Sequence, residues 1–173
     1  PSSDGRYVYF TAGFNGWRVE VETGKEEKII EFQADGMKEK GMVAAAMGTT
    51  CLSNSGKWWG VTYKVAEKSR FMIIDTENGE GKSILEANSI SHMQFCPDDE
   101  EQIFYAGPLT DRVWTIRLDG SGNQRVYEKK PQEWITHESW LPKTNEIAFV
   151  DWPNGMRAIN IHTKKERQLT HFN

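Results

Sequence analysis

One pattern of short strands and polar turns recurs along the chain about every 45 residues. The clearest copies begin at His92 and His137, which are 45 positions apart, and each histidine stands five residues before a proline. In both copies a polar turn follows the proline, and an apolar stretch comes next. Tandem units of this length stack, because a single unit cannot bury its apolar face alone. The repeat therefore restricts the fold to a series of similar, stacked units.

Each unit has the composition of a four-stranded antiparallel sheet. The order is strand, polar turn, strand, loop, strand, tight turn and short strand, and glycine closes the tight turn in most units, as hairpin turns favour. Stretches such as Trp114 to Leu118 alternate with a period of two, which favours strands over helices. We therefore predict an all-β fold, a β-propeller fragment in which residues 1–173 form a single domain. The chain would supply about four blades, approximately residues 1–35, 43–88, 90–130 and 135–173.

Composition is consistent with thin strands around a packed core. Of 173 residues, 38% are hydrophobic and 12% are aromatic, which suits many short strands. The net charge is −4 and the basic residues are dispersed, so we do not expect nucleic acid as a partner. No apolar run approaches the roughly 18–20 residues of a membrane span, so we expect no membrane insertion.

Three further expectations concern organisation and location. Residues 32–49 contain three glycines and are predicted to form an insertion or long loop before the second blade. Cys51 and Cys96 fall in different blades, so we expect buried free thiols and a cytoplasmic location, with the periplasm as the alternative. The chain starts at Pro1 on a turn and stops where another unit should begin, so we expect it to be part of a longer protein.

The two histidines are the first candidates for a functional site. In a propeller the first strand of each blade lines the central channel. His92 and His137 lie at or just before the start of that strand in neighbouring blades. A common phase would direct both imidazoles into one cavity. The alternative is that each histidine caps a strand or hydrogen-bonds a neighbouring blade.

Polar residues near the histidines could complete such a site. The segment from Glu133 to Glu138 places a carboxylate and a hydroxyl around the imidazole of His137, which could orient its tautomer. Gln94 is expected to alternate onto the same side of its strand as His92. These neighbours favour the functional interpretation of the pair.

Arg112 precedes another predicted strand and offers a planar guanidinium, which suits a bidentate contact with a carboxylate. We predict that Arg112 and Gln94 bind substrate, and the alternative for Arg112 is a salt bridge between blades. His162 stands beside a run of charged residues and is expected to be a surface residue. The sequence contains no nucleophile elbow, P-loop, HExxH or CxxC motif.

The segment from His92 to Asn173 resembles the oligogalacturonate lyase family, seven-bladed TolB-like propellers that cleave short pectin fragments. The remainder of the chain agrees with the family only in its blades. The motifs that carry the resemblance are HMQFCPDD (His92 to Asp99), YAGP (Tyr105 to Pro108), DRVW (Asp111 to Trp114) and EWITHESW (Glu133 to Trp140). The resemblance implies an enzyme whose substrate is an oligogalacturonide.

The resemblance also implies roles for individual residues. In the family, histidines and a glutamine hold a manganese ion (Mn²⁺), and a separate histidine is the proposed base. His137 matches a metal ligand and His92 matches the base, while the other ligands are expected beyond Asn173. An arginine also assists in the family, but none of the three basic residues within 64–70 aligns with it convincingly.

The implied reaction is a metal-assisted β-elimination that yields an unsaturated uronate. A neutral histidine would remove the C5 proton of a uronate while a cation neutralises the adjacent carboxylate. The rival from another class is a TolB-like propeller that only binds partners, with histidines that support packing. We also expect this fragment alone to be inactive, and its exposed blade edges could pair between copies to form a homo-oligomer.

Overall fold

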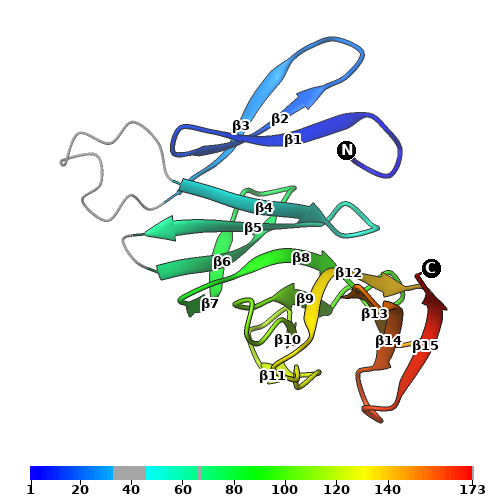
Figure 1. Cartoon of the computed structure of the whole chain (residues 1–173). Coiled ribbons are helices and arrows are strands. Elements are labelled where there is room, and N and C mark those ends of the chain that lie inside the picture. Colours follow the sequence, from blue (N-terminus) through cyan, green and yellow to red (C-terminus); the bar gives the residue numbers. More distant parts are fainter. Residues whose placement is uncertain (33–45, 66–67, 173) are drawn as a thin grey trace. The chain divides into compact units, whose positions relative to one another are not determined.

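The computed structural model describes residues 1–32, 46–65 and 68–172, and every regular element in these ranges is a β-strand (Figure 1). The chain forms two compact units, Pro1–Asn88 and Ser89–Asn173. Each unit contains two antiparallel sheets, and within each sheet neighbouring strands are consecutive in sequence. The prediction of an all-β fold is confirmed.

The first unit holds a three-stranded sheet and a four-stranded sheet. The three-stranded sheet consists of β1 (Tyr7–Ala12), β2 (Asn15–Glu20) and β3 (Glu26–Glu31). The four-stranded sheet consists of β4 (Ala46–Leu52), β5 (Trp58–Val65), β6 (Lys68–Asp75) and β7 (Gly81–Ala87). Aromatic side chains dominate the core of this unit, in which Trp59, Tyr63 and Phe32 are buried.

The predicted loop over residues 32–49 ends earlier than expected, because β4 already begins at Ala46. Residues 33–45 lie outside the described part of the chain. Cys51 and Cys96 are both free thiols, as predicted, but only Cys96 is buried, and Cys51 is half-buried. The described part of the chain contains no helix long and apolar enough to cross a membrane.

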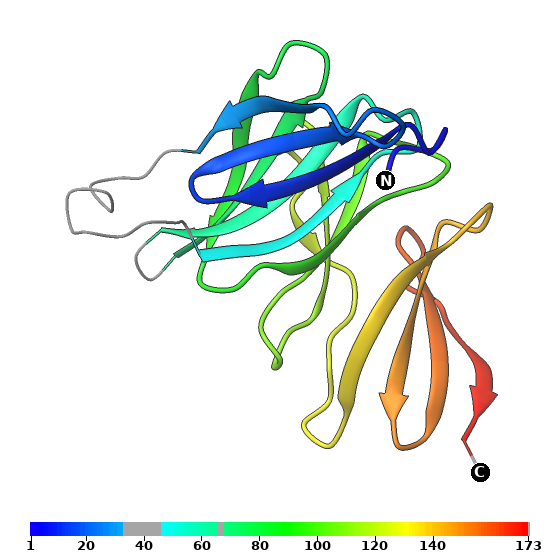
Figure 2. The same ribbon diagram turned by 90° about the horizontal axis from the view of Figure 1, so that it is seen from above.

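The second unit holds two four-stranded sheets, whose strands can be followed in Figure 2. The first consists of β8 (Ser91–Phe95), β9 (Gln102–Ala106), β10 (Val113–Arg117) and β11 (Gln124–Arg125). The second consists of β12 (Trp134–Leu141), β13 (Glu146–Trp152), β14 (Gly155–Asn160) and β15 (Glu166–His171). Phe104 of one sheet and Ile135 and Phe149 of the other belong to one buried core.

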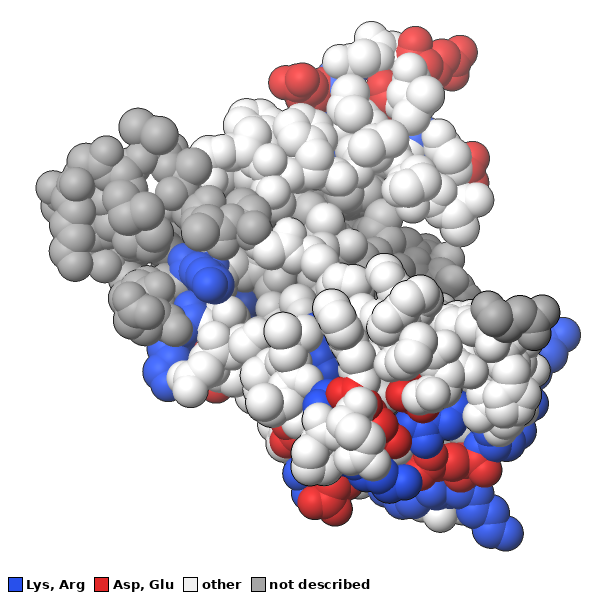
Figure 3. Space-filling view, viewed as in Figure 1, with Lys and Arg blue, Asp and Glu red and all other residues white. Residues whose placement is uncertain are grey.

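Glycine at the hairpin turns has the backbone conformation that the sequence predicted. The φ angles are 69° at Gly24, 75° at Gly79 and 91° at Gly120. Gly79 and Gly120 follow the third strand of their sheets, and Gly24 follows the second strand of the three-stranded sheet, so the turn positions could be read from sequence. On the face shown in Figure 3, acidic and basic side chains of the second unit are intermixed rather than gathered by sign.

Candidate functional site

Three sheets share a β-bulge in their first strand. In β4, β8 and β12 the register shifts, so that two residues of this strand oppose one residue of the second strand. The first of the two residues is Gly48 in β4, His92 in β8 and His137 in β12. The equal phase of the two histidines in the sequence is therefore an equal position in their sheets.

Both histidines have a left-handed backbone, with φ of 47° at His92 and 52° at His137. Three other described non-glycine residues, Lys143, Asn145 and Lys164, also have positive φ, but they lie in turns between strands. Such a conformation costs about 1–3 kcal/mol for a residue other than glycine, although histidine adopts it more readily than most. Bulges and strained residues concentrate at functional sites, because they redirect a side chain. The backbone thus singles out the same two residues as the sequence.

Both imidazoles are exposed, and within the described part of the chain no side-chain hydrogen bond or ion pair engages either ring. The expectation that a carboxylate of the segment Glu133 to Glu138 orients the His137 ring is wrong, because Glu138 binds Arg112 and Glu133 has other partners. The Glu133 carboxylate accepts hydrogen bonds from Tyr127 Oη at 2.6 Å, from the Lys130 amide at 2.8 Å and from Arg157 Nη2 at 2.9 Å. Glu133 therefore stabilises the segment that leads into β12, and it does not orient the imidazole.

The Glu133 network predicts a dependence of stability on pH. Burial alone would raise the pKa of Glu133, but the hydrogen bonds from Tyr127 and Lys130 and the charge of Arg157 outweigh it and lower the pKa. A carboxyl with a lowered pKa stabilises the fold above its unfolded-state value, roughly 4.3, and this contribution is lost as the pH falls through the folded value. Glu133→Gln should therefore destabilise the protein by about 1–3 kcal/mol at neutral pH and by less in acid.

Urea unfolding between pH 7 and pH 3 measures this difference. Glu128→Gln is the matched control, because the Glu128 side chain is 80% exposed in its pair with Arg125. An equal effect of the two substitutions at neutral pH, or a Glu133→Gln penalty that does not shrink in acid, would contradict the prediction.

Arg112 forms the salt bridge that the sequence left open as an alternative. Its Nε and Nη2 atoms donate to Oε1 and Oε2 of Glu138 at 2.7 and 2.9 Å. The Glu138 side chain is 0% exposed and that of Arg112 is 9% exposed. The pair joins the residue before β10 to the middle of β12, across the two sheets of the second unit. A contact of Arg112 with substrate stays a prediction.

Gln94 also joins the two sheets of the second unit. Its side-chain Oε1 accepts a hydrogen bond from the Trp140 amide at 3.2 Å, and its backbone oxygen accepts one from Trp140 Nε1 at 3.1 Å. The bulge separates Gln94 from His92, so the simple alternation that placed them on one side does not hold. A role of Gln94 in substrate binding stays a prediction.

The three basic residues upstream of His92 lie on β5 and β6. Arg70 Nε pairs with Glu86 at 3.1 Å, and Lys68 Nζ donates to Asn88 Oδ1 at 2.6 Å. Lys64 is exposed at the end of β5. These contacts single out none of the three as an assisting cation.

A pocket of about 270 Å³ lies beside His137. Its other lining residues are Trp134, Thr136, Val150 and Trp152. The two tryptophans are opposite each other across β12 and β13 and are 61% and 56% exposed. Trp134 was not among the predicted site residues, although it lies three positions before His137 in the EWITHESW motif.

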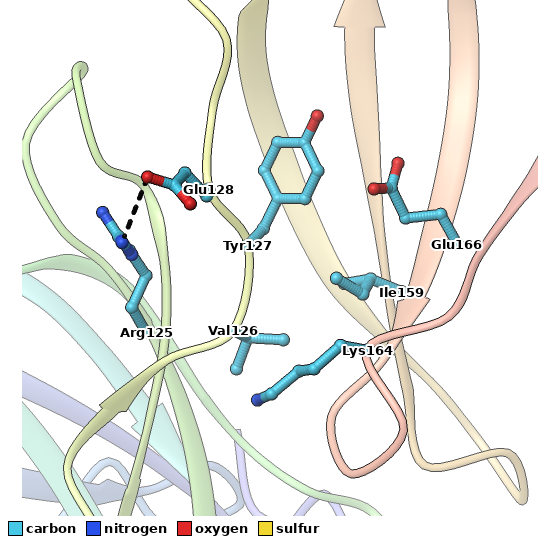
Figure 4. Close-up of a pocket in the computed structure, with 7 residues that line it drawn as sticks. All are labelled: Arg125, Val126, Tyr127, Glu128, Ile159, Lys164 and Glu166. Carbon is cyan, nitrogen blue, oxygen red and sulfur yellow. Dashed lines mark ion pairs between the residues drawn. The ribbon is translucent and has the colours of Figure 1, made fainter.

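A larger pocket of about 330 Å³ lies between β11 and the β14–β15 turn (Figure 4). Its wall carries charges of both signs, including an ion pair between Arg125 and Glu128 at 3.4 Å. Lys164 extends toward the segment that carries Val126, and its burial lowers the pKa of its amine. None of the predicted site residues lines this pocket, so it is not the candidate site.

Of the residues predicted to bind the metal ion, the described part of the chain contains His137. No group of three His, Cys, Asp or Glu side chains among them could hold a metal ion. The exposed imidazole of His137 suits a single ligand position, because neutral imidazole binds divalent transition metals and no described residue competes for the ring. That the other ligands lie beyond Asn173 stays a prediction.

Nearly the whole chain matches one known protein family. The model of the family described as oligogalacturonate lyase matches residues 2–173. The chain belongs to the oligogalacturonate lyase family. The family resemblance that the motifs of the second unit suggested is thereby confirmed, and it extends over the first unit as well.

A curated member of the family is the oligogalacturonate lyase of Dickeya dadantii, which is 34% identical over 112 residues. The match covers 58% of this chain and 29% of that enzyme. A relative from Pectobacterium atrosepticum, an oligogalacturonide lyase, is 32% identical over 111 residues, with the same shares of the two chains covered. The chain thus spans well under two thirds of the length of these relatives.

A solved structure with the same fold is an oligogalacturonate lyase in complex with manganese. It superposes with a TM-score of 0.82 at 20% identity, over 99% of this chain and 52% of that one. TolB from Acinetobacter baumannii superposes with a TM-score of 0.68 at 13% identity, over 99% of this chain and 42% of that one. These likenesses confirm the β-propeller fold and its TolB-like character.

Proposed function

We propose that the full-length protein is a lyase that cleaves oligogalacturonides by β-elimination, with His92 as the base and His137 as a ligand of a divalent cation. The family match over residues 2–173 carries the proposal. Two exposed histidines at the same bulge position of neighbouring sheets supply the residues that such a reaction requires. The manganese complex of a solved family member supports the choice of cation.

The β-elimination requires a base beside the C5 carbon of a uronate. The neutral His92 ring would accept the C5 proton, the electron pair would form the C4–C5 double bond, and the glycosidic oxygen on C4 would leave. When bound, the cation would neutralise the uronate carboxylate and so acidify the C5 proton. His92 is suited to the proton transfer, because its ring is exposed and an imidazole nitrogen can accept a proton from a bound substrate.

The pocket beside His137 supports a saccharide substrate. Trp134 and Trp152 present exposed aromatic faces next to the candidate ligand, and the pocket volume of about 270 Å³ is large enough for one sugar ring. The proposal includes Gln94 and Arg112 as substrate-binding residues. A cytoplasmic location is part of the proposal and rests on the two free cysteines.

The test is an assay of the full-length protein with digalacturonate and trigalacturonate. The product carries a C4–C5 double bond conjugated to a carboxylate, so its formation is followed by ultraviolet absorbance. We expect activity that a chelator removes and manganese restores. Absence of the unsaturated product, or full activity in a preparation without stoichiometric divalent metal, would refute the proposal. The same assay on residues 1–173 alone tests the expectation that the fragment is inactive.

A further inference from the structure

The ion pair between Arg112 and Glu138 is the most deeply buried charge pair of the second unit, judged over the described residues. Both oxygens of Glu138 accept a hydrogen bond from the guanidinium, at 2.7 and 2.9 Å. Burial of two charges is costly, and apolar residues of similar volume often replace such a pair without loss of stability. Stability alone therefore gives no reason for charges at this place.

Glu138 follows His137 directly and is the second residue of the β12 bulge. Because the two residues share a peptide unit, a carboxylate that is held in one place restricts the backbone at His137. The bidentate contact fixes the Glu138 side chain in direction as well as in distance. The left-handed φ of 52° at His137 lies immediately before this fixed point.

Arg112 is itself held by a tight loop. The Gly107 amide donates to the Arg112 oxygen at 2.8 Å, and Trp114 Nε1 donates to the Asp111 oxygen at 2.9 Å. A Cβ atom on Gly107 would lie 2.4 Å from the Asp111 oxygen, so the loop closes too tightly for another residue. The guanidinium thus projects from a rigid support toward β12.

The β8 bulge provides an internal comparison. Its second residue is Met93, which is 3% exposed and occupies the position that Glu138 has in β12. His92 nevertheless has a φ of 47°, close to that of His137. A bulge of this register therefore forms when its second residue is apolar, as Met93 is in β8. The bulge in β12 does not need an ion pair to form, yet β12, which carries the candidate ligand His137, has one.

We propose that Arg112 is a positioning residue that acts through Glu138 to hold the His137 imidazole in the direction required for cation binding. The inference rests on the proposed function, since it takes His137 as a ligand. It gives Arg112 a task that does not depend on contact with substrate. The fork of the guanidinium, rather than its charge alone, performs this task, because only the fork fixes both carboxylate oxygens.

Titration of the full-length protein with Mn²⁺, followed by the electron paramagnetic resonance signal of the free ion, tests the proposal without an activity assay. Arg112→Leu combined with Glu138→Met gives β12 an apolar pair like the one that Met93 represents in β8. We expect its dissociation constant for Mn²⁺ to rise at least tenfold, within the roughly 10–100-fold range for supports of metal ligands. Arg112→Lys, which keeps the charge but not the fork, should show the same direction of change.

The matched control removes another bidentate pair of the same unit. Arg167 binds Glu146 through Nε at 3.1 Å and Nη2 at 2.7 Å, on β15 and β13. Arg167→Leu with Glu146→Met should leave the dissociation constant within about twofold of the wild-type value. Thermal unfolding of all variants shows which of them are folded, and if the double variant at Arg112 and Glu138 does not fold, Arg112→Lys decides alone.

Wild-type Mn²⁺ affinity in the folded Arg112 variants would overturn the proposal, as would an equal loss in the control. His137→Asn separates this failure from that of the proposed function. If His137→Asn loses Mn²⁺ while the Arg112 variants retain it, only the positioning role is wrong. If His137→Asn binds Mn²⁺ as the wild type does, His137 is not a ligand, and both assignments fall.

Discussion

Replacement of His92 in the full-length protein should abolish formation of the unsaturated uronate product. A positioned general base contributes about 10²–10⁴-fold to the rate of a proton abstraction. His92→Ala removes the imidazole but also places alanine at a φ of 47°, where its Cβ is strained. His92→Asn is the sharper variant, because asparagine tolerates this backbone conformation and cannot act as the base. Initial rates of ultraviolet absorbance increase on trigalacturonate measure the effect.

His162→Asn is the control for this experiment. His162 is exposed in the turn between β14 and β15, away from the bulge positions, and should be replaceable without effect on the rate. Undiminished activity of His92→Asn would exclude His92 as the base. A loss confined to substrate affinity, with an unchanged maximal rate, would assign His92 to binding instead.

Arg112→Ala should destabilise the protein by about 3–5 kcal/mol. The substitution leaves the Glu138 carboxylate with 0% of its side chain exposed and without the two donors that compensate its burial. This loss is a large part of the roughly 5–15 kcal/mol that holds an ordinary domain folded. Urea unfolding of the full-length protein, followed by tryptophan fluorescence, measures it.

Arg167→Ala provides the comparison in the same unit. Arg167 also binds its carboxylate through two nitrogens, but its side chain is 52% exposed, and exposed pairs contribute at most about 1 kcal/mol. The two substitutions should therefore differ by several-fold in their effect on the free energy of unfolding. Equal effects would mean that water reaches Glu138 in solution.

The fold was readable from the sequence because the signals that specify it are local and repeated. Strand alternation and turn glycines recur in every unit, and the positive φ of Gly24, Gly79 and Gly120 follows from the hairpins that they close. Within residues 32–49 the sequence did not predict where the next strand begins. The strand pattern there is weak, and the start of β4 at Ala46 was missed.

The site was only partly readable, because its partners are distant in sequence. Period and phase identified His92 and His137, yet they could not show the bulge, which breaks the alternation from which facing residues are inferred. The partner of Arg112 was left open between substrate and protein, and Glu138 lies 26 positions away. The same holds for Glu133, whose hydrogen bonds go to Tyr127 and Arg157 rather than to the nearby histidine.

The shared bulge has a consequence for how such a protein can change during evolution. Gly48, His92 and His137 occupy one register position, and the ladders on either side of it are alike in the three sheets. A mutation at this position exchanges the chemical group on the first strand while the hydrogen bonds that define the sheet stay in place. In each of these three sheets the bulge therefore offers one position at which the side chain can change while the sheet is kept.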